Sequence, residues 1–255
     1  VGGQVVEVFN DLVATRESTV IDVGQGATLV MHGDLKLALS GENTSKCNFR
    51  FVGPGTKVIR GSSCRPDGVE WTAAMAFANG TTRLEGDLAL PGFDLGSGDV
   101  YTPKLEIAPG GRVRIVTCTT GVGQIRNGAE LDICGGILDQ RISTTQPFYF
   151  STGTLRIRNG GILRTSNSYR HGYNGLSETI VETGGVWSCS SAHYMEGSRG
   201  GGAIHLTVRG GTVFAETTYG FNLGYRASDG ATSNTNWIHL AAGGEFRTGK
   251  LNQGF

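Results

Sequence analysis

The chain has 255 residues, 42 of them glycine, and its 22 basic and 22 acidic residues leave no formal net charge. Glycine is too rare for a collagen triple helix, which needs it at every third position, and hydrophobic residues, at 38%, are too frequent for a disordered chain. The absence of net charge argues against nucleic acid as a partner and against docking on a membrane through a basic patch. No apolar run reaches the length of a transmembrane helix, so no membrane span is predicted.

One phrase recurs along the chain: a short alternating strand, a turn with glycine, and a second short strand. Copies of the phrase occupy residues 21–31, 50–60, 76–86, 105–115, 123–133, 155–165, 179–189, 206–216 and 239–249. The reference glycines of their turns are Gly26, Gly55, Gly80, Gly110, Gly128, Gly160, Gly184, Gly210 and Gly243. Successive reference glycines are 18 to 33 residues apart, with a mean near 27. One copy cannot bury its own apolar face, whereas stacked copies bury a continuous column and pair every strand with its neighbours.

The repeat therefore predicts an all-β fold, a right-handed parallel β-helix (β-solenoid) of about nine coils that forms a single domain over residues 1–255. Insertions in outward loops account for the variable coil length. An all-β sandwich is the alternative, but it would not keep the phrase in phase through nine copies. Two segments also have helical features: residues 4–16, which suit a strand equally well, and residues 70–78.

The phrases, for example LRIRNGGILRT at 155–165 and TIVETGGVWSC at 179–189, resemble passenger domains of autotransporter-type adhesins and related large bacterial surface β-helices. The resemblance covers nearly the whole chain through composition and period. It implies an exported, extracellular or cell-surface β-helix that belongs to a longer protein and serves adhesion, scaffolding or fibre building. The partner it implies is a glycan or a surface protein of a host or neighbouring cell. The five cysteines are a departure, because such passengers are usually poor in cysteine.

The end of the chain adds an expectation about assembly. Residues 250–255 follow directly on a repeat phrase and contain no polar cap. An uncovered coil exposes unpaired strand edges. We therefore expect that the native chain continues or that it associates end to end with another copy.

The β-helix fold also carries polysaccharide lyases and glycoside hydrolases, so an enzyme of that kind is the alternative function. A glycosidase needs two carboxylates about 5–9 Å apart, which on a β-helix would occupy the same phase of adjacent coils. Asp132, Asp139, Glu182 and Glu216 do not share a phase, and we expect them to be solvated residues of the outer face. No catalytic residue is assigned, and the sequence favours a non-enzymatic module.

Three consecutive coils carry aromatic, histidine and arginine residues after the second strand of the phrase. Tyr169, His193 and Tyr219 each lie nine residues after their reference glycine. Equal phase predicts rings stacked about 4.8 Å apart on one face. The stack is either structural or part of a strip that binds a glycan or a partner protein. The candidate binding residues are Tyr169, Arg170, His171, Tyr173, His193, Tyr194, Tyr219, Tyr225 and Arg226.

The cysteines allow two short disulfide loops. Cys47 and Cys64 are 17 positions apart, and Cys118 and Cys134 are 16 apart, which leaves Cys189 over. The alternative is that all five are buried thiols. There is no C-x-x-C motif and the histidines do not cluster at ligand spacing, so neither a metal nor a cofactor is predicted.

Overall fold

The structure is a computed structural model that describes most of the chain. In this part, the elements of regular secondary structure are all β-strands. The described residues are 3–14, 19–37, 49–64, 75–90, 92–96, 101–115, 124–140, 148–165, 169–171, 175–190, 193–195, 203–215, 221–223, 236–249 and 251–253. Over these ranges, no helix has the length and hydropathy needed to cross a membrane.

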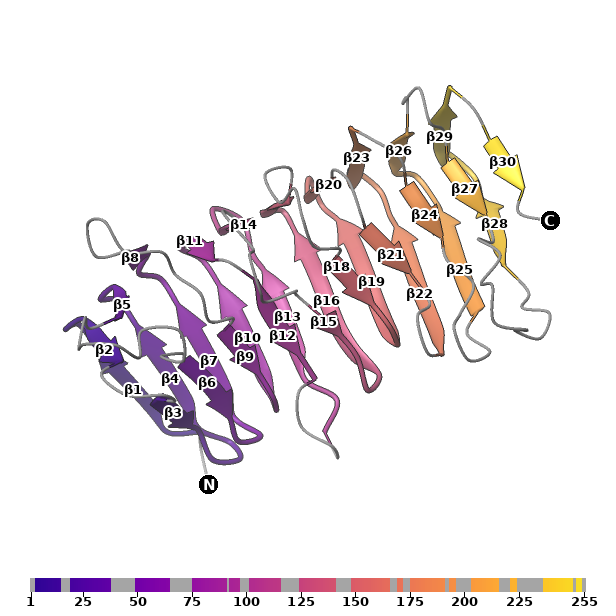
Figure 1. Cartoon of the computed structure of the whole chain (residues 1–255). Helices are drawn as coiled ribbons and strands as arrows, with labels where there is room; N and C mark the ends of the chain where they lie inside the picture. The colour runs from indigo at the N-terminus through magenta and orange to yellow at the C-terminus, as the bar shows by residue number, and fades with distance from the viewer. Residues whose placement is uncertain are drawn as a thin grey trace, which may run out of the picture.

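The strands stack coil upon coil into parallel sheets, and one sheet, sheet A, runs the whole length of the molecule (Figure 1). Its ten strands all pair in parallel with their neighbours. They are β1 (Val5–Val8), β4 (Thr28–Met31), β7 (Thr56–Ile59), β10 (Thr81–Leu84), β13 (Lys104–Ile107), β16 (Ala129–Cys134), β19 (Gly153–Arg158), β22 (Leu176–Val181), β25 (Ala203–Val208) and β28 (Trp237–Leu240).

A second face is divided between two sheets. Sheet B contains β2 (Leu12–Ala14), β5 (Leu35–Leu37) and β8 (Ser63–Cys64). Sheet D contains β11 (Asp87–Leu90), β14 (Arg112–Ile115), β17 (Ile137–Gln140), β20 (Ile162–Thr165), β23 (Val186–Cys189), β26 (Thr212–Ala215) and β29 (Glu245–Thr248).

The third face is sheet C, which again has ten strands. They are β3 (Thr19–Asp22), β6 (Phe49–Val52), β9 (Met75–Phe77), β12 (Phe93–Leu95), β15 (Gln124–Ile125), β18 (Phe148–Phe150), β21 (Tyr169–His171), β24 (His193–Met195), β27 (Phe221–Leu223) and β30 (Leu251–Gln253). Each coil thus contributes one strand to each of three faces.

The prediction of a parallel β-solenoid is confirmed, with ten strands in sheets A and C where about nine coils were expected. Each of the nine phrases includes one strand of sheet A, and the tenth strand is β1, which precedes the first phrase. The phrases are irregularly spaced because they occur at two different corners of the coil. Gly55 lies between strands of sheets C and A, whereas Gly160 and Gly184 lie between strands of sheets A and D. At the corner between sheets A and D, the glycines recur every 24 to 26 residues from Gly86 through Gly111, Gly136, Gly161 and Gly185 to Gly211, and Gly244 follows 33 residues later.

Glycine is needed at this corner because adjacent coils come into close contact there. A Cβ atom at Gly161 would lie 2.0 Å from the carbonyl oxygen of Ile133 in the preceding coil. The next coil continues the stack, since the N–H of Val186 donates to the carbonyl of Gly161 at 2.9 Å. The turn is therefore hydrogen bonded from coil to coil, and no side chain fits between its layers.

The core is a set of stacked columns formed by alternate residues of each strand. In sheet A, Leu105 pairs with Leu131, and Leu131 pairs with Leu155, and all three are fully buried. In sheet C, the rings of Phe51 and Phe77 stack with their centroids 5.3 Å apart. Like residues on adjacent coils fill the interior, and the residues between them are left on the outer faces.

The two segments with a helical pattern contain strands and no helix in their described parts. Residues 4–16 contain β1 and β2. Residues 75–77 form β9, whereas 70–74 lie outside the described residues. Strand β9 pairs in register with β6 on one side and β12 on the other, and pairing on both sides outweighs the local helix propensity.

Candidate functional site

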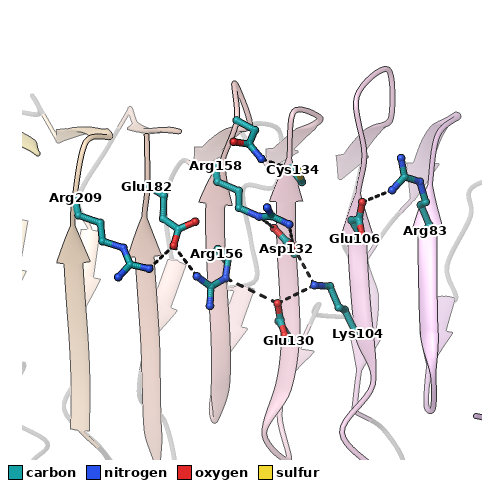
Figure 2. Close-up of polar contacts among 11 residues, drawn as sticks. Arg83, Lys104, Glu106, Glu130, Asp132, Cys134, Arg156, Arg158, Glu182 and Arg209 are labelled. Carbon is teal, nitrogen blue, oxygen red and sulfur yellow. Dashed lines mark hydrogen bonds and ion pairs between the residues drawn. The ribbon is translucent and has the colours of Figure 1, made fainter. Parts of the chain in front are cut away.

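Charged side chains cover the outer face of sheet A from β10 to β25 (Figure 2). Because the strands pair in register, residues at equivalent positions form columns, with Lys104 beside Glu130 and Asp132 beside Arg156. Strand alternation places these side chains outside and their neighbours, such as Leu131, inside. We call this set the charged ladder: Arg83, Lys104, Glu106, Glu130, Asp132, Arg156, Arg158, Glu182 and Arg209.

Asp132 is the buried centre of the charged ladder, with 0% of the residue exposed. Lys104 donates from Nζ to Oδ2 at 3.0 Å. Arg158 donates from Nε to Oδ1 at 3.1 Å and from Nη2 to Oδ2 at 2.9 Å. Burial alone would raise the pKa of Asp132, but the hydrogen bonds from Arg158 and Lys104 outweigh it and hold that pKa below its ordinary value. The carboxylate is therefore ionised at neutral pH and is held from both sides.

The remaining carboxylates of the charged ladder are bound in the same way. Glu130 lies 3.0 Å from Nζ of Lys104 and 4.0 Å from Nε of Arg156. Glu182 accepts hydrogen bonds from Arg156 at 2.7 Å and from Arg209 at 2.5 Å. Figure 2 shows these contacts running from strand to strand, so each of these carboxylates lies beside cationic side chains of neighbouring coils.

Two carboxylates that we expected to be solvated are in fact buried. Asp132 is fully covered and Asp139 is only 4% exposed. Oδ2 of Asp139 lies 3.4 Å from Nη1 of Arg164 and 3.9 Å from Nη2 of Arg112. Guanidinium groups from the adjacent coils thus bind the carboxylate of Asp139. Glu182 is partly exposed, and Glu216 lies outside the described residues.

Cys134 ends strand β16 beside the charged ladder and is a free cysteine. Asn159 donates from Nδ2 to its Sγ at 3.3 Å. Cys118, the predicted partner of Cys134, lies outside the described residues, so a disulfide between these two cysteines stays a prediction. Cys189 is buried in β23. The other predicted bridge lies outside the described side chains, which do not include Cys47, Cys64 or Cys118.

The predicted aromatic strip falls on sheet C. Arg170 of β21 pairs with Tyr194 of β24. Tyr169 and His193, one position earlier on each strand, therefore occupy equivalent positions, in agreement with their equal phase in the sequence. Phe148 of β18 extends this row by one coil, because it pairs with Tyr169.

On the following coil, the register differs from the sequence phase. His193 pairs with Phe221, and eleven residues separate Phe221 from Gly210 where nine separate His193 from Gly184. The side chains of Tyr169, Arg170, His171, His193 and Tyr194 are outside the described set. The backbone is likewise not described at Tyr173, Tyr219, Tyr225 and Arg226. A binding role for the strip therefore stays a prediction.

Sheet C also carries a perturbed carboxyl group that the sequence did not indicate. Arg126 donates from Nη2 to Oδ2 of Asp94 at 2.7 Å, while Oδ1 is buried and lacks a partner among the described residues. Burial raises the pKa of Asp94, against the lowering effect of Arg126 and Arg50. Such a group is a candidate catalytic acid. Its register neighbours, Ala76 and Gln124, bring no second carboxyl group.

Metal binding finds no support in the described part of the chain, where no three His, Cys, Asp or Glu side chains come together. Comparison with protein-family models finds no match, and comparisons with curated proteins and with solved structures find none either. The fold class therefore rests on the sheet topology of the chain itself.

Proposed function

We propose that the chain is a non-enzymatic β-helix module that acts as an elongated scaffold in adhesion or fibre building outside the cell. The charged ladder is the observation that supports this role. Each of its ion pairs joins strands of different coils, as Arg158 of β19 joins Asp132 of β16. Separation of these coils would take Lys104 and Arg158 away from the buried carboxylate of Asp132, so the pairs oppose any slip of one coil past the next.

The resemblance to autotransporter passengers supports the exported location and the surface partner in this proposal. A glycan or surface protein would bind along the outside of the rod, with the strip that contains Tyr169 and Tyr194 as one candidate surface. End-to-end association with another copy would extend the same architecture.

The alternative is a polysaccharide lyase or hydrolase. The carboxylates of the charged ladder suit it poorly, because general acid catalysis requires a carboxyl group that holds a proton near the working pH, and hydrogen bonds keep Asp132 ionised. Asp94 is the described carboxyl group with a raised pKa, and it is therefore the described candidate for the catalytic acid of such an enzyme.

The test is incubation of the purified chain with pectin, alginate, starch, xylan and chitin, followed by assays of reducing ends and of unsaturated products. We expect no cleavage. Cleavage that the Asp94→Asn variant abolishes would overturn the scaffold proposal in favour of the enzyme. Cleavage that this variant retains would overturn it equally and would place the reaction elsewhere.

The mechanical role has its own test. Single-molecule pulling along the solenoid axis should show a lower unfolding force for Asp132→Asn than for the wild type. The matched control is Asp87→Asn, because Asp87 also pairs with an arginine of the next coil but its side chain is 43% exposed. Equal unfolding forces for the two variants would contradict a mechanical role for the buried ion pairs of Asp132.

A further inference from the structure

A second group of side chains lies on the outer face of sheet A and shares strands β22 and β25 with the end of the charged ladder. Glu178, His205 and Trp237 form one register column on β22, β25 and β28. His239 follows Trp237 by two residues and therefore lies on the same face. We call these four residues the Trp237 cluster.

The rings of the Trp237 cluster are in contact. His205 stacks on Trp237 with ring centroids 4.4 Å apart and an interplanar angle of 29°. His239 meets Trp237 edge-on, with centroids 6.1 Å apart. Glu178, His205 and Trp237 are partly exposed, and His239 is exposed. The cluster thus presents an aromatic surface to solvent with polar groups at its sides.

Glu178 distinguishes this surface from the charged ladder. Among the described residues, it has neither an ion-pair partner nor a side-chain hydrogen bond, whereas Glu130 and Glu182 each lie within 4.0 Å of two cations. Its register neighbours are Thr154 and His205, and neither carries a permanent charge. The cluster therefore combines an exposed aromatic ring with an acceptor that no described cation neutralises.

We propose that the Trp237 cluster binds a neutral glycan laid along the solenoid axis. The hydroxyl groups of a sugar chain bond to carboxylates, imidazoles and the indole N–H, and its apolar C–H groups pack against the edges of the stacked His205 and Trp237 rings. Coils spaced about 4.8 Å apart present Trp237, His205 and Glu178 to successive parts of a sugar chain. A cationic ligand binds this cluster less well, because a cation is attracted to the face of an aromatic ring and His205 covers one face of the indole.

This inference rests on the proposed function, since it describes a module that holds a glycan without cutting it. The probes are six-sugar oligomers of β-1,4-glucose, β-1,4-mannose, β-1,4-N-acetylglucosamine and α-1,4-glucose. Binding is measured by calorimetry, and the recovered sugars are analysed by mass spectrometry. We expect at least one oligomer to bind, with affinity about tenfold weaker in Trp237→Ala and several-fold weaker in Glu178→Gln.

The control is Tyr101→Ala, which removes a 53% exposed aromatic side chain away from the Trp237 cluster. It should bind as the wild type does, and His239→Ala replaces Trp237→Ala if that variant does not fold. No binding to any oligomer, or equal binding by the cluster variants and the wild type, would overturn the inference. An oligolysine peptide that bound in place of the sugars would overturn the glycan assignment. Cleaved oligomers would instead overturn the proposed function.

Discussion

Arg158 binds both carboxylate oxygens of Asp132, although the two residues are not register partners. The backbone pairs Asp132 with Arg156, and Arg158 with Cys134. Arg158 therefore reaches diagonally across the strands, which leaves Arg156 to contact Glu182 of the following coil. This crossing connects three consecutive coils through side chains as well as through the backbone.

The first prediction is that Asp132→Asn destabilises the fold. The substitution leaves Lys104 and Arg158 without their shared counter-charge beside a buried amide, and we expect a loss of about 2–3 kcal/mol in the free energy of unfolding. Urea denaturation followed by circular dichroism measures it. The control Asp87→Asn removes a more exposed pair and should cost less than about 1 kcal/mol. Equal losses would show that burial does not set the strength of the interaction.

The second prediction concerns acid. The folded-state pKa values of Asp132 and Glu182 lie below their ordinary values of 3.8 and 4.5, because hydrogen bonds from cationic side chains outweigh burial. Their contribution to stability is therefore present above those ordinary values and is lost as the pH falls through the lower, folded-state values. The melting temperature should drop between pH 5 and about 2, and the drop should be shallower in Asp132→Asn. Parallel profiles would contradict the role assigned to Asp132.

Lys57 is a charged residue that lies inside the solenoid, with 0% of the residue exposed. Its Nζ donates to the carbonyl oxygens of Gly53, Gly55 and Asn79, the last two at 3.1 and 2.9 Å. Burial lowers the pKa of Lys57 from 10.5 to about 8, against the raising effect of Asp22. The ammonium group thus satisfies the carbonyls of a corner at the cost of desolvation.

The third prediction follows from this pKa. Between pH 8 and 10.5 the unfolded chain binds the Lys57 proton while the folded chain releases it, so this group adds stability as the pH rises. We expect a gain of about 1–3 kcal/mol across that range. It should be absent from Lys57→Met, and the difference between the two urea-denaturation profiles isolates Lys57 from other groups. A difference that does not change with pH would refute the prediction.

The fourth prediction concerns the glycine corner. Gly161→Ala would place Cβ 2.0 Å from the carbonyl oxygen of Ile133, and we expect it to cost about 3 kcal/mol or more, or to prevent folding. Gly24→Ala is the matched control, because a Cβ there meets nothing within 4 Å. Expression level and thermal melting compare the two. A Gly161→Ala protein as stable as Gly24→Ala would contradict the close contact between coils.

Local sequence patterns predict the fold class correctly but give one coil too few. The alternating residues of strands such as β13 and the glycine turns predict stacked parallel strands, since both signals act within a few residues. The predicted number of coils is one too low because β1 precedes the first glycine phrase. The spacing of the phrases is irregular because Gly55 and Gly160 occur in similar phrases at different corners. Residues 70–78 have helical features in the sequence, although 75–77 form a strand, because pairing with β6 and β12 leaves no trace in the local pattern.

The candidate site shows the same division. The sequence alone determined that the chain alternates apolar and polar residues around glycine turns, and hence that it coils with a dry interior and polar outer faces. Only the tertiary structure decided which polar residues meet. Asp132 and Arg158 are 26 positions apart, and stacking brings them together, so a carboxylate expected to be solvated is buried under a guanidinium group. Long-range contacts of this kind depend on the register between coils, which is settled by packing of the whole stack and not by any one segment.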